Sequence, residues 1–276
     1  DMSGMKTGTE LYMSLYPEKS TGAQLRLGCI VPDFKADTTM GPMEFHKWKA
    51  GKWAILFSHP ADFTPVCTTE IGRLALKYDE LAAMDCLVAT LSVDPVKSHT
   101  EWLTDVVAHC ENKIEIKFPI IGDNDRKIST AYGMFDQKNA MDQALPLTIR
   151  CVFIINPENK LMRSLNYPAC VGRSMDEIVR CVKALQLSYK KSIATPANWP
   201  NNHSDMLVGG KRTSEFKGSV FLLPTVSDEE AKSNYPGFHT CELPSEKPYL
   251  RLVKAEDVGF EVPPSQPGCA EVCSIM

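Results

Sequence analysis

WAILFSHPADFTPVCTTE, residues Trp53–Glu70, joins an apolar run to a segment dense in proline and hydroxyl side chains. The run 53–58 has the length and apolar character of a buried strand, and from Thr68 to Met84 apolar residues recur at helical spacing. Cys67 therefore lies at a strand-to-helix junction, where unpaired backbone N–H groups and the positive end of the helix dipole gather. That position favours a thiolate, which is the reactive form of cysteine.

The alternation of strands and helices continues along the chain. Further strands are predicted at 86–93, 118–121, 150–155 and 161–167, and further helices at 98–109, 125–132 and 174–187. This order is typical of an α/β domain built on one central sheet. After Thr195 the composition shifts toward proline and turn residues with little periodicity. We therefore predict an N-terminal extension over 1–25, an α/β domain over 26–195 and a smaller, looser C-terminal domain or arm over 196–276.

Composition excludes several classes of function. The net charge of −4 gives no electrostatic reason to expect nucleic-acid binding. No apolar run approaches the roughly 18–20 residues that cross a bilayer, and no secretory signal is visible. The ten cysteines contain no CxxC pair, which argues against a zinc ribbon or a dithiol redox motif. Scattered thiols without a secretion signal suit a reducing compartment. We expect a cytoplasmic protein that needs neither a metal nor a cofactor.

From the residues alone, Cys67 is as readily a structural cysteine as a reactive one. Asp62 and Glu70 are acidic and oppose a thiolate, so a reactive Cys67 needs a cation from elsewhere in the fold. Thr64 stands three residues before Cys67, where a thioredoxin-type CxxC motif has its first cysteine. A dithiol cycle is excluded at that spacing, whereas oxidation of one thiol is not.

The pattern Pro60-x-x-x-Thr64-x-x-Cys67 resembles the active-site signature of the peroxiredoxins, and the wider stretch 53–70 resembles their one-cysteine subfamily. The similarity covers about residues 26–253. Matching segments follow in order: FPII at 118–121, LPLTIR at 145–150, YPACVGR at 167–173, LQL at 185–187, ATP at 194–196 and LPT at 223–225.

The resemblance implies a thioredoxin-like fold, with a central mixed sheet flanked by helices, and thiol-dependent reduction of hydrogen peroxide and organic hydroperoxides. Cys67 corresponds to the peroxidatic cysteine, whose thiolate attacks the O–O bond and becomes a sulfenic acid. Thr64 would hydrogen-bond the peroxide, and Pro60 would shield the pocket. Arg150 matches the arginine that stabilises the thiolate and the developing negative charge, which supplies the missing cation.

Three further residues belong to this expected site. Glu70 and Arg173 resemble a supporting polar network, although a plain salt bridge explains them equally well. His59 matches a histidine beside the active site, and a purely structural histidine is an equal alternative.

The resemblance also implies partners. One-cysteine members rely on an external thiol, often glutathione or thioredoxin, to reduce the sulfenic acid, and they form homodimers or higher oligomers. This chain has spare thiols, of which Cys241 in the C-terminal arm is our first candidate for an internal resolving cysteine, ahead of Cys29, Cys170, Cys269 and Cys273. A chaperone or structural protein with the same fold and little peroxidase role is the alternative function.

Two sequence features depart from the family pattern. Cys273-Ser-Ile-Met276 fits a C-a-a-X farnesylation signal, and membrane association is expected only if Cys273 is lipidated. Mammalian one-cysteine members also carry a phospholipase motif, but Lys52 stands here in place of its nucleophilic serine. A lysine cannot simply take over serine's acyl-transfer chemistry with His46 as base, so we expect no such activity.

Overall fold

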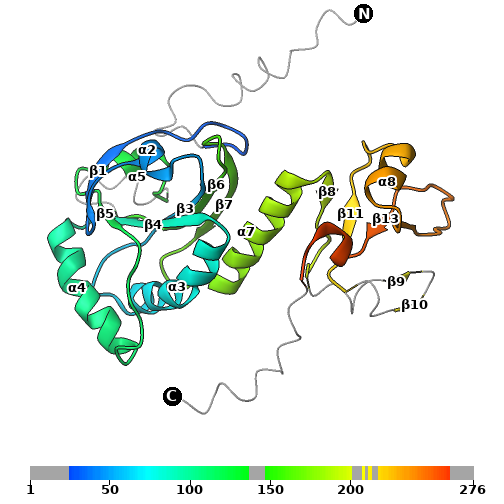
Figure 1. Cartoon of the computed structure of the whole chain (residues 1–276). Helices are drawn as coiled ribbons and strands as arrows, with labels where there is room; N and C mark the ends of the chain where they lie inside the picture. The colour runs from blue at the N-terminus through cyan, green and yellow to red at the C-terminus, as the bar shows by residue number, and fades with distance from the viewer. Residues whose placement is uncertain (1–24, 137–146, 201–206, 209–210, 213–216, 262–276) are drawn as a thin grey trace, which may run out of the picture. The chain divides into compact units, whose positions relative to one another are not determined.

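The computed structural model describes residues 25–136, 147–200, 207–208, 211–212 and 217–261 of the 276-residue chain (Figure 1). The chain divides into two compact units, Asp1–Val179 and Arg180–Met276. This division falls inside a helix, Met175–Lys190 (α7), rather than at the composition change after Thr195. The expected extension over 1–25 lies almost wholly outside the described residues, so the domain limits stay a prediction.

The first unit is built on a seven-stranded mixed sheet. In spatial order its strands are β2 (Gly41–Glu44), β1 (Lys35–Thr38), β5 (Ile120–Gly122), β4 (Cys86–Ser92), β3 (Trp53–Ser58), β6 (Arg150–Ile155) and β7 (Leu161–Tyr167). The three strands β3, β4 and β5 run parallel, and the other neighbouring pairs are antiparallel. The predicted central mixed sheet is confirmed.

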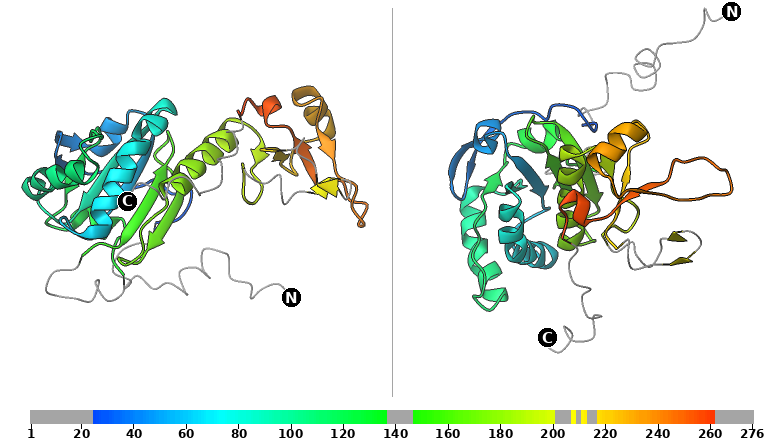
Figure 2. Two further views of the ribbon diagram at one scale, coloured as in Figure 1. Left: turned by 90° about the horizontal axis from the view of Figure 1, so that it is seen from below. Right: turned by 45° about the vertical axis from the view of Figure 1, so that its right-hand side comes forward.

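Helices cover both faces of this sheet (Figure 1). One face packs against α2 (Phe45–Lys49) and α5 (Lys127–Ala131), and its core includes Leu56 and Phe153. The other face is covered by α3 (Pro65–Ala83) and α4 (Val96–His109), which lie in front of the strands when seen from below (Figure 2, left). Because both faces are covered, β3 and β6 are buried at every position and read as continuous apolar runs.

The register of β3 against β6 decides which residues meet at one edge of the sheet. Phe57, near the end of β3, pairs with Val152, near the start of antiparallel β6. Arg150, the first residue of β6, in turn pairs with Tyr167, the last residue of β7. The end of β3, the start of β6 and the end of β7 therefore lie together, and α3 begins at the same edge.

The second unit has its own sheet and core. Its four strands lie in the order β12 (His239–Thr240), β13 (Arg251–Val253), β11 (Val220–Leu222) and β8 (Ile193–Ala194). It also contains α8 (Asp228–Asn234), a 3-10 turn at Glu256–Val258, and a short hairpin of β9 (Leu207–Val208) and β10 (Lys211–Arg212). Trp199 is fully buried in its core and donates from Nε1 to the Gly218 carbonyl at 2.8 Å. The C-terminal arm is thus a small folded unit.

Within the described part of the chain, no helix combines the length and the apolar character that crossing a membrane requires.

Candidate active site

Cys67 lies in the first turn of α3 and is fully buried. The loop before it turns sharply at Phe63, which has a positive φ of 52°, and Pro65 opens the helix. Thr64 occupies the N-cap position in an extended conformation, but its hydroxyl does not cap the helix. It donates instead to the Ala61 carbonyl at 2.9 Å, so the oxygen lone pairs of Thr64 remain able to accept a hydrogen bond.

Arg150 supplies the cation that a reactive Cys67 requires. Its Nη1 donates to Cys67 Sγ at 3.2 Å and to Glu70 Oε2 at 2.8 Å. Its Nε and Nη2 both donate to the Ala169 carbonyl, at 2.9 and 2.6 Å. The guanidinium is therefore held in one orientation from two sides and presents an N–H to the sulfur. A buried positive charge at this distance stabilises the thiolate over the thiol.

Glu70 joins Arg150 to a second buried arginine. Its two carboxylate oxygens accept from Arg173 Nε and Nη2 at 2.9 and 2.7 Å, and from the backbone N–H of Arg173 at 2.7 Å. Burial alone would raise the pKa of the Glu70 carboxyl, but these hydrogen bonds and the charge of Arg150 outweigh it and hold that pKa below its ordinary value. Glu70 is therefore ionised, and its charge is compensated by two guanidinium groups.

Arg173 ties this ion cluster to the sheet. Its Nη1 donates to the carbonyls of Ser58, at the end of β3, and Cys151, at the start of β6, at 2.9 and 2.7 Å. The expectation that Glu70 opposes the Cys67 thiolate is thus too simple, because the acid is one member of a buried cluster with two cations.

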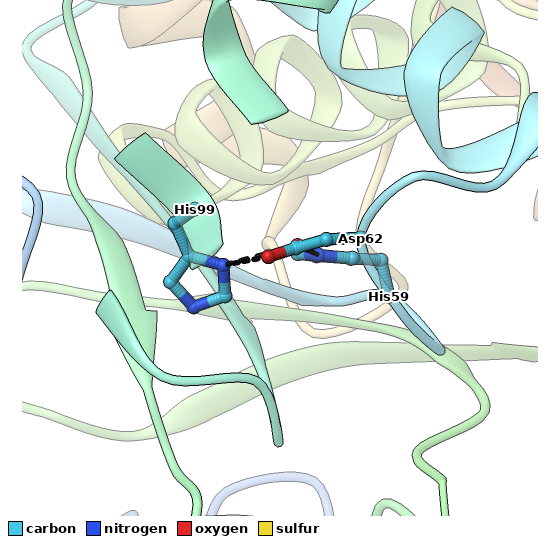
Figure 3. A group of neighbouring side chains, drawn as sticks. All are labelled: His59, Asp62 and His99. Atoms are coloured by element: carbon cyan, nitrogen blue, oxygen red, sulfur yellow. Dashed lines mark hydrogen bonds and ion pairs between the residues drawn. The ribbon is translucent and has the colours of Figure 1, made fainter. Parts of the chain in front are cut away.

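The loop between β3 and α3 also takes part in a second buried cluster, and Figure 3 shows its three side chains. Asp62 Oδ1 accepts from His59 Nε2 at 3.0 Å, and Asp62 Oδ2 lies 2.8 Å from His99 Nδ1. Ser98 Oγ donates to Asp62 Oδ2 at 2.7 Å, and the backbone N–H of Asp62 donates to Asp94 Oδ2 at 2.9 Å. These bonds attach the loop between β3 and α3 to the start of α4.

Burial and hydrogen bonding shift the pKa of two members of this cluster, Asp62 and His59. The ring of His99 lies between them and the sheet, with Nε2 3.1 Å from the Ile121 carbonyl, so both of its nitrogens face an oxygen acceptor. Burial alone would raise the pKa of Asp62, but the hydrogen bonds of His59 and His99 outweigh it and lower that pKa. Burial lowers the pKa of His59, which stays neutral and donates from Nε2 to the carboxylate.

His59, Asp62 and His99 also have the composition of a metal site. In the described part of the chain they form the group whose potential metal-ligand atoms all lie within 4.8 Å of one another. Both rings already hydrogen-bond the carboxylate between them, so we interpret the group as a hydrogen-bonded cluster. The sequence predicts His59 at the site and Asp62 as an acid near the thiol. His99 was not predicted there, because no short-range pattern links a helix residue to a loop more than thirty positions earlier.

The structure brings the main predicted residues to one place. Cys67, Arg150, Glu70 and Arg173 are joined by direct contacts, and Thr64 belongs to the loop that leads into the Cys67 turn. Pro60, also in that loop, is buried.

The other predicted cysteines lie elsewhere. Cys241 is buried in the second unit, where its backbone N–H donates to the Leu250 carbonyl and burial raises the pKa of its thiol. Its resolving role stays a prediction. Cys269 and Cys273 lie outside the described residues.

Lys52, which replaces the serine of the phospholipase motif, is engaged elsewhere. Its ammonium forms an ion pair with Asp85 at 2.8 Å. The backbone N–H of His46 donates to Asp33 Oδ1 at 2.9 Å, and His46 Nδ1 lies 4.0 Å from the same oxygen. The bonds of Lys52 and His46 described here thus join neither residue to Cys67 or to the Arg150–Glu70–Arg173 cluster.

Comparison with known proteins matches this architecture. The model of the AhpC/TSA family matches residues 27–164. Peroxiredoxin-6 of Homo sapiens is 43% identical over 230 residues, which cover 82% of this chain and 96% of that protein. Peroxiredoxin-6 of Gallus gallus is 44% identical over the same shares.

Two solved structures are similar over most of the chain. Peroxiredoxin 6 of Arenicola marina superposes with a TM-score of 0.73 at 38% identity and covers 83% of this chain and 98% of its own. A yeast mitochondrial 1-Cys peroxiredoxin gives a TM-score of 0.69 at 35% identity, over 84% of this chain and 100% of its own. The chain therefore belongs to the AhpC/TSA family, in its one-cysteine peroxiredoxin branch, and is a thiol-dependent peroxidase.

Proposed function

We propose that Cys67 is the peroxidatic cysteine and that Arg150 is the residue that activates it. The observation that carries this proposal is the 3.2 Å hydrogen bond from Arg150 Nη1 to Cys67 Sγ in a fully buried setting. The thiolate attacks one peroxide oxygen, the O–O bond breaks, and the departing oxygen leaves as water or an alcohol after taking up a proton. Cys67 becomes a sulfenic acid. Arg150 stabilises both the thiolate and the negative charge that develops on the departing oxygen.

The loop residues position the peroxide in this scheme. Thr64 donates its proton to Ala61, so its oxygen is an acceptor for the O–H of the incoming peroxide. Pro60 offers no N–H to compete for the substrate and limits the entry of water. Glu70 and Arg173 keep Arg150 in place, and His59 holds the loop through Asp62.

An external thiol returns Cys67 to its reduced form in our proposal. The yeast mitochondrial 1-Cys peroxiredoxin resolves its thiol through the glutathione and thioredoxin systems, and we propose a reductant of the same class for this chain. A cytoplasmic location is consistent with eight described cysteines that are all free. We also propose a homodimer, for which the outer edge of β7 beyond Leu161 is an available surface, since no further strand pairs with it among the described residues. No observation favours the chaperone or structural alternative.

The test is peroxide consumption in a single turnover. Cys67→Ser should abolish it. Arg150→Gln should slow it by about 10²–10³, the size of effect seen when one donor to a developing oxyanion is removed. Cys86→Ser is the matched control, because Cys86 is a buried strand cysteine whose pKa burial raises to about 12, and it should react as the wild type does. Undiminished consumption by Cys67→Ser would overturn the assignment.

A further inference from the structure

A second thiol lies on the turn that Arg150 holds. The turn connects β7 to α7, and within it the backbone N–H of Val171 donates to the Pro168 carbonyl at 3.0 Å. Cys170 is exposed at this turn. The other described cysteines are buried, apart from Cys29 and Cys110, which are partly exposed. Cys170 is therefore the most accessible thiol of the described part of the chain.

Hydrogen bonds through Arg150 and Arg173, and one close backbone approach, join this turn to the N-terminal part of α3. Arg150 Nη1 binds Cys67 Sγ while its Nε and Nη2 bind the carbonyl of Ala169, the residue before Cys170. A Cβ at Gly172 would lie 3.4 Å from a methyl group of Val66, the residue before Cys67. The backbone N–H of Arg173 binds Glu70. The turn and the start of α3 are therefore held close to each other by residues that flank Cys170 on the turn and Cys67 on the helix.

These bonds limit the separation of the two thiols. The path from Cys67 Sγ through the guanidinium and the Ala169 carbonyl places the Cα of Cys170 within about 11 Å of that sulfur. A disulfide requires Cα atoms within about 7 Å of each other, so from the far end of this range the bond needs a movement of several ångströms. Cys170 is the exposed residue of the turn between these links, and Cys67 lies in the first helical turn, whose leading N–H groups lack intrahelical partners.

The different accessibility of the two thiols gives a chemical reason for a disulfide between Cys67 and Cys170. A hydroperoxide is small, but a reducing thiol arrives on a tripeptide or a protein, and Cys67 has no exposed surface. Oxidation also removes the negative charge of the thiolate, which weakens the pull of Arg150 on Cys67. Arg150 then keeps its bonds to Glu70 and Ala169, and its link between the helix and the turn is reduced by one contact.

We propose that Cys170 is the internal resolving cysteine of this chain. The inference rests on the proposed role of Cys67. The Cys170 sulfur attacks the sulfur of the Cys67 sulfenic acid, an S–S bond forms, the S–O bond breaks, and the hydroxyl leaves as water with the proton of the Cys170 thiol. An external thiol then reduces the disulfide at the exposed Cys170 side. Two external thiols become one disulfide, and Cys67 and Cys170 return to thiols.

The experiment treats reduced full-length protein with one equivalent of hydrogen peroxide and no reductant. The readouts are the number of free thiols and the cysteine-linked peptides found by mass mapping. Wild type should lose two thiols and yield a Cys67–Cys170 peptide within one chain. Cys170→Ser should lose one thiol, accumulate a sulfenic acid that dimedone traps, and consume the first equivalent of peroxide at the wild-type rate.

Cys29→Ser is the matched control. Cys29 is a partly exposed thiol of the same unit, and its carbonyl binds Leu161, at the opposite end of β7 from the turn and roughly 20 Å away. This variant should form the Cys67–Cys170 peptide as the wild type does. Peroxide consumption by wild type that leaves Cys170 free, links Cys67 to Cys241, or links two chains covalently would overturn the resolving role alone. Failure of wild type to consume peroxide would overturn the role of Cys67 as well.

Discussion

Glu70 holds the active-site geometry, because one buried carboxylate accepts from both Arg150 and Arg173. Removing its charge leaves two buried guanidinium groups facing each other without compensation. Glu70→Gln should lower the free energy of unfolding by about 3–5 kcal/mol, as expected for a broken buried ion pair. It should also slow peroxide consumption, because Arg150 is no longer oriented.

The measurement for Glu70 is urea denaturation with peroxide kinetics on the same samples. Asp79→Asn is its control on the same helix, since Asp79 pairs with Lys117 at the surface and should contribute about 1 kcal/mol or less. Equal stability losses in the two variants would contradict the role of Glu70.

His59 gives stability a defined pH dependence. Its pKa is lowered by burial from the ordinary value of 6.5, so below that pH the unfolded chain binds a proton that the folded protein resists. The contribution of His59 is therefore complete above pH 6.5 and declines as the pH falls toward its lowered pKa. The stability advantage of wild type over His59→Gln should shrink by up to about 1.4 kcal/mol per pH unit in that window.

Denaturation curves at pH 7.5, 6.5 and 5.5 test this dependence. Val88→Ala, which truncates a buried side chain without an ionisable group, should show a difference that does not vary with pH. A constant gap between wild type and His59→Gln over the same range would show that His59 is not held neutral.

Among the individual site residues, the sequence predicted those that belong to short motifs and those that the charge around Cys67 requires. The acidic neighbours of Cys67 called for a distant cation, the family resemblance named Arg150 for it, and Arg150 contacts the sulfur. Asp62 was visible as an acid but not as the partner of two histidines, because the pairing with His99 depends on where α4 begins relative to the loop. Long-range side-chain clusters of this kind have no periodic signal in a sequence.

Among the elements, α3 and α4 pack closely enough that one glycine is required. A Cβ added at Gly72, in the middle of α3, would lie 2.7 Å from Cys110 Sγ at the end of α4. Gly72→Ala should therefore destabilise the protein by about 1–3 kcal/mol through overpacking, although alanine is the better helix former.

A double-mutant cycle isolates that contact. Cys110→Ala removes the sulfur, so in its presence Gly72→Ala should become neutral or stabilising by up to about 1 kcal/mol. Thermal or urea denaturation of the four proteins gives the coupling. Additive effects of the two substitutions would show that the contact between the helices is not the cause.

Helices and strands with a strong hydrophobic periodicity could be predicted from the sequence, whereas the shortest strands could not. The strand at 53–58 and the helix predicted at 174–187 are confirmed, and at the start of that helix the Glu177 N–H donates to Ser174 Oγ at 3.3 Å. The strands β1 and β2 were missed because four residues of mixed polarity show no usable alternation. The same holds for the two- and three-residue strands of the second unit, where pairing partners rather than propensity define the strand.

For the whole molecule, the two units have separate cores, and Trp199 is the largest side chain fully buried in the second. Trp199→Ala should cost about 3–5 kcal/mol of stability in that unit. It should leave the first peroxide turnover unchanged, because Cys67 and its ion cluster belong to the first unit.

Near-ultraviolet circular dichroism and limited proteolysis report on the second unit, and single-turnover kinetics report on the first. Tyr249→Ala, which truncates an exposed aromatic residue of the second unit, should change neither. A parallel loss of reactivity in Trp199→Ala would mean that the first unit depends on the fold of the second.

Helix α7 also determines where the chain tolerates shortening. Ile178 and Val179 are buried before the division between the units, and Ala184 and Leu187 pack into the core around Trp199 after it. A polypeptide ending at residue 179 would cut the helix near its start, whereas one ending at 190 would keep the helix but leave its second half uncovered. An expression design for the peroxidase unit alone should therefore end after Lys190 and replace Ala184 and Leu187 with polar helix formers, so that the released surface does not promote aggregation.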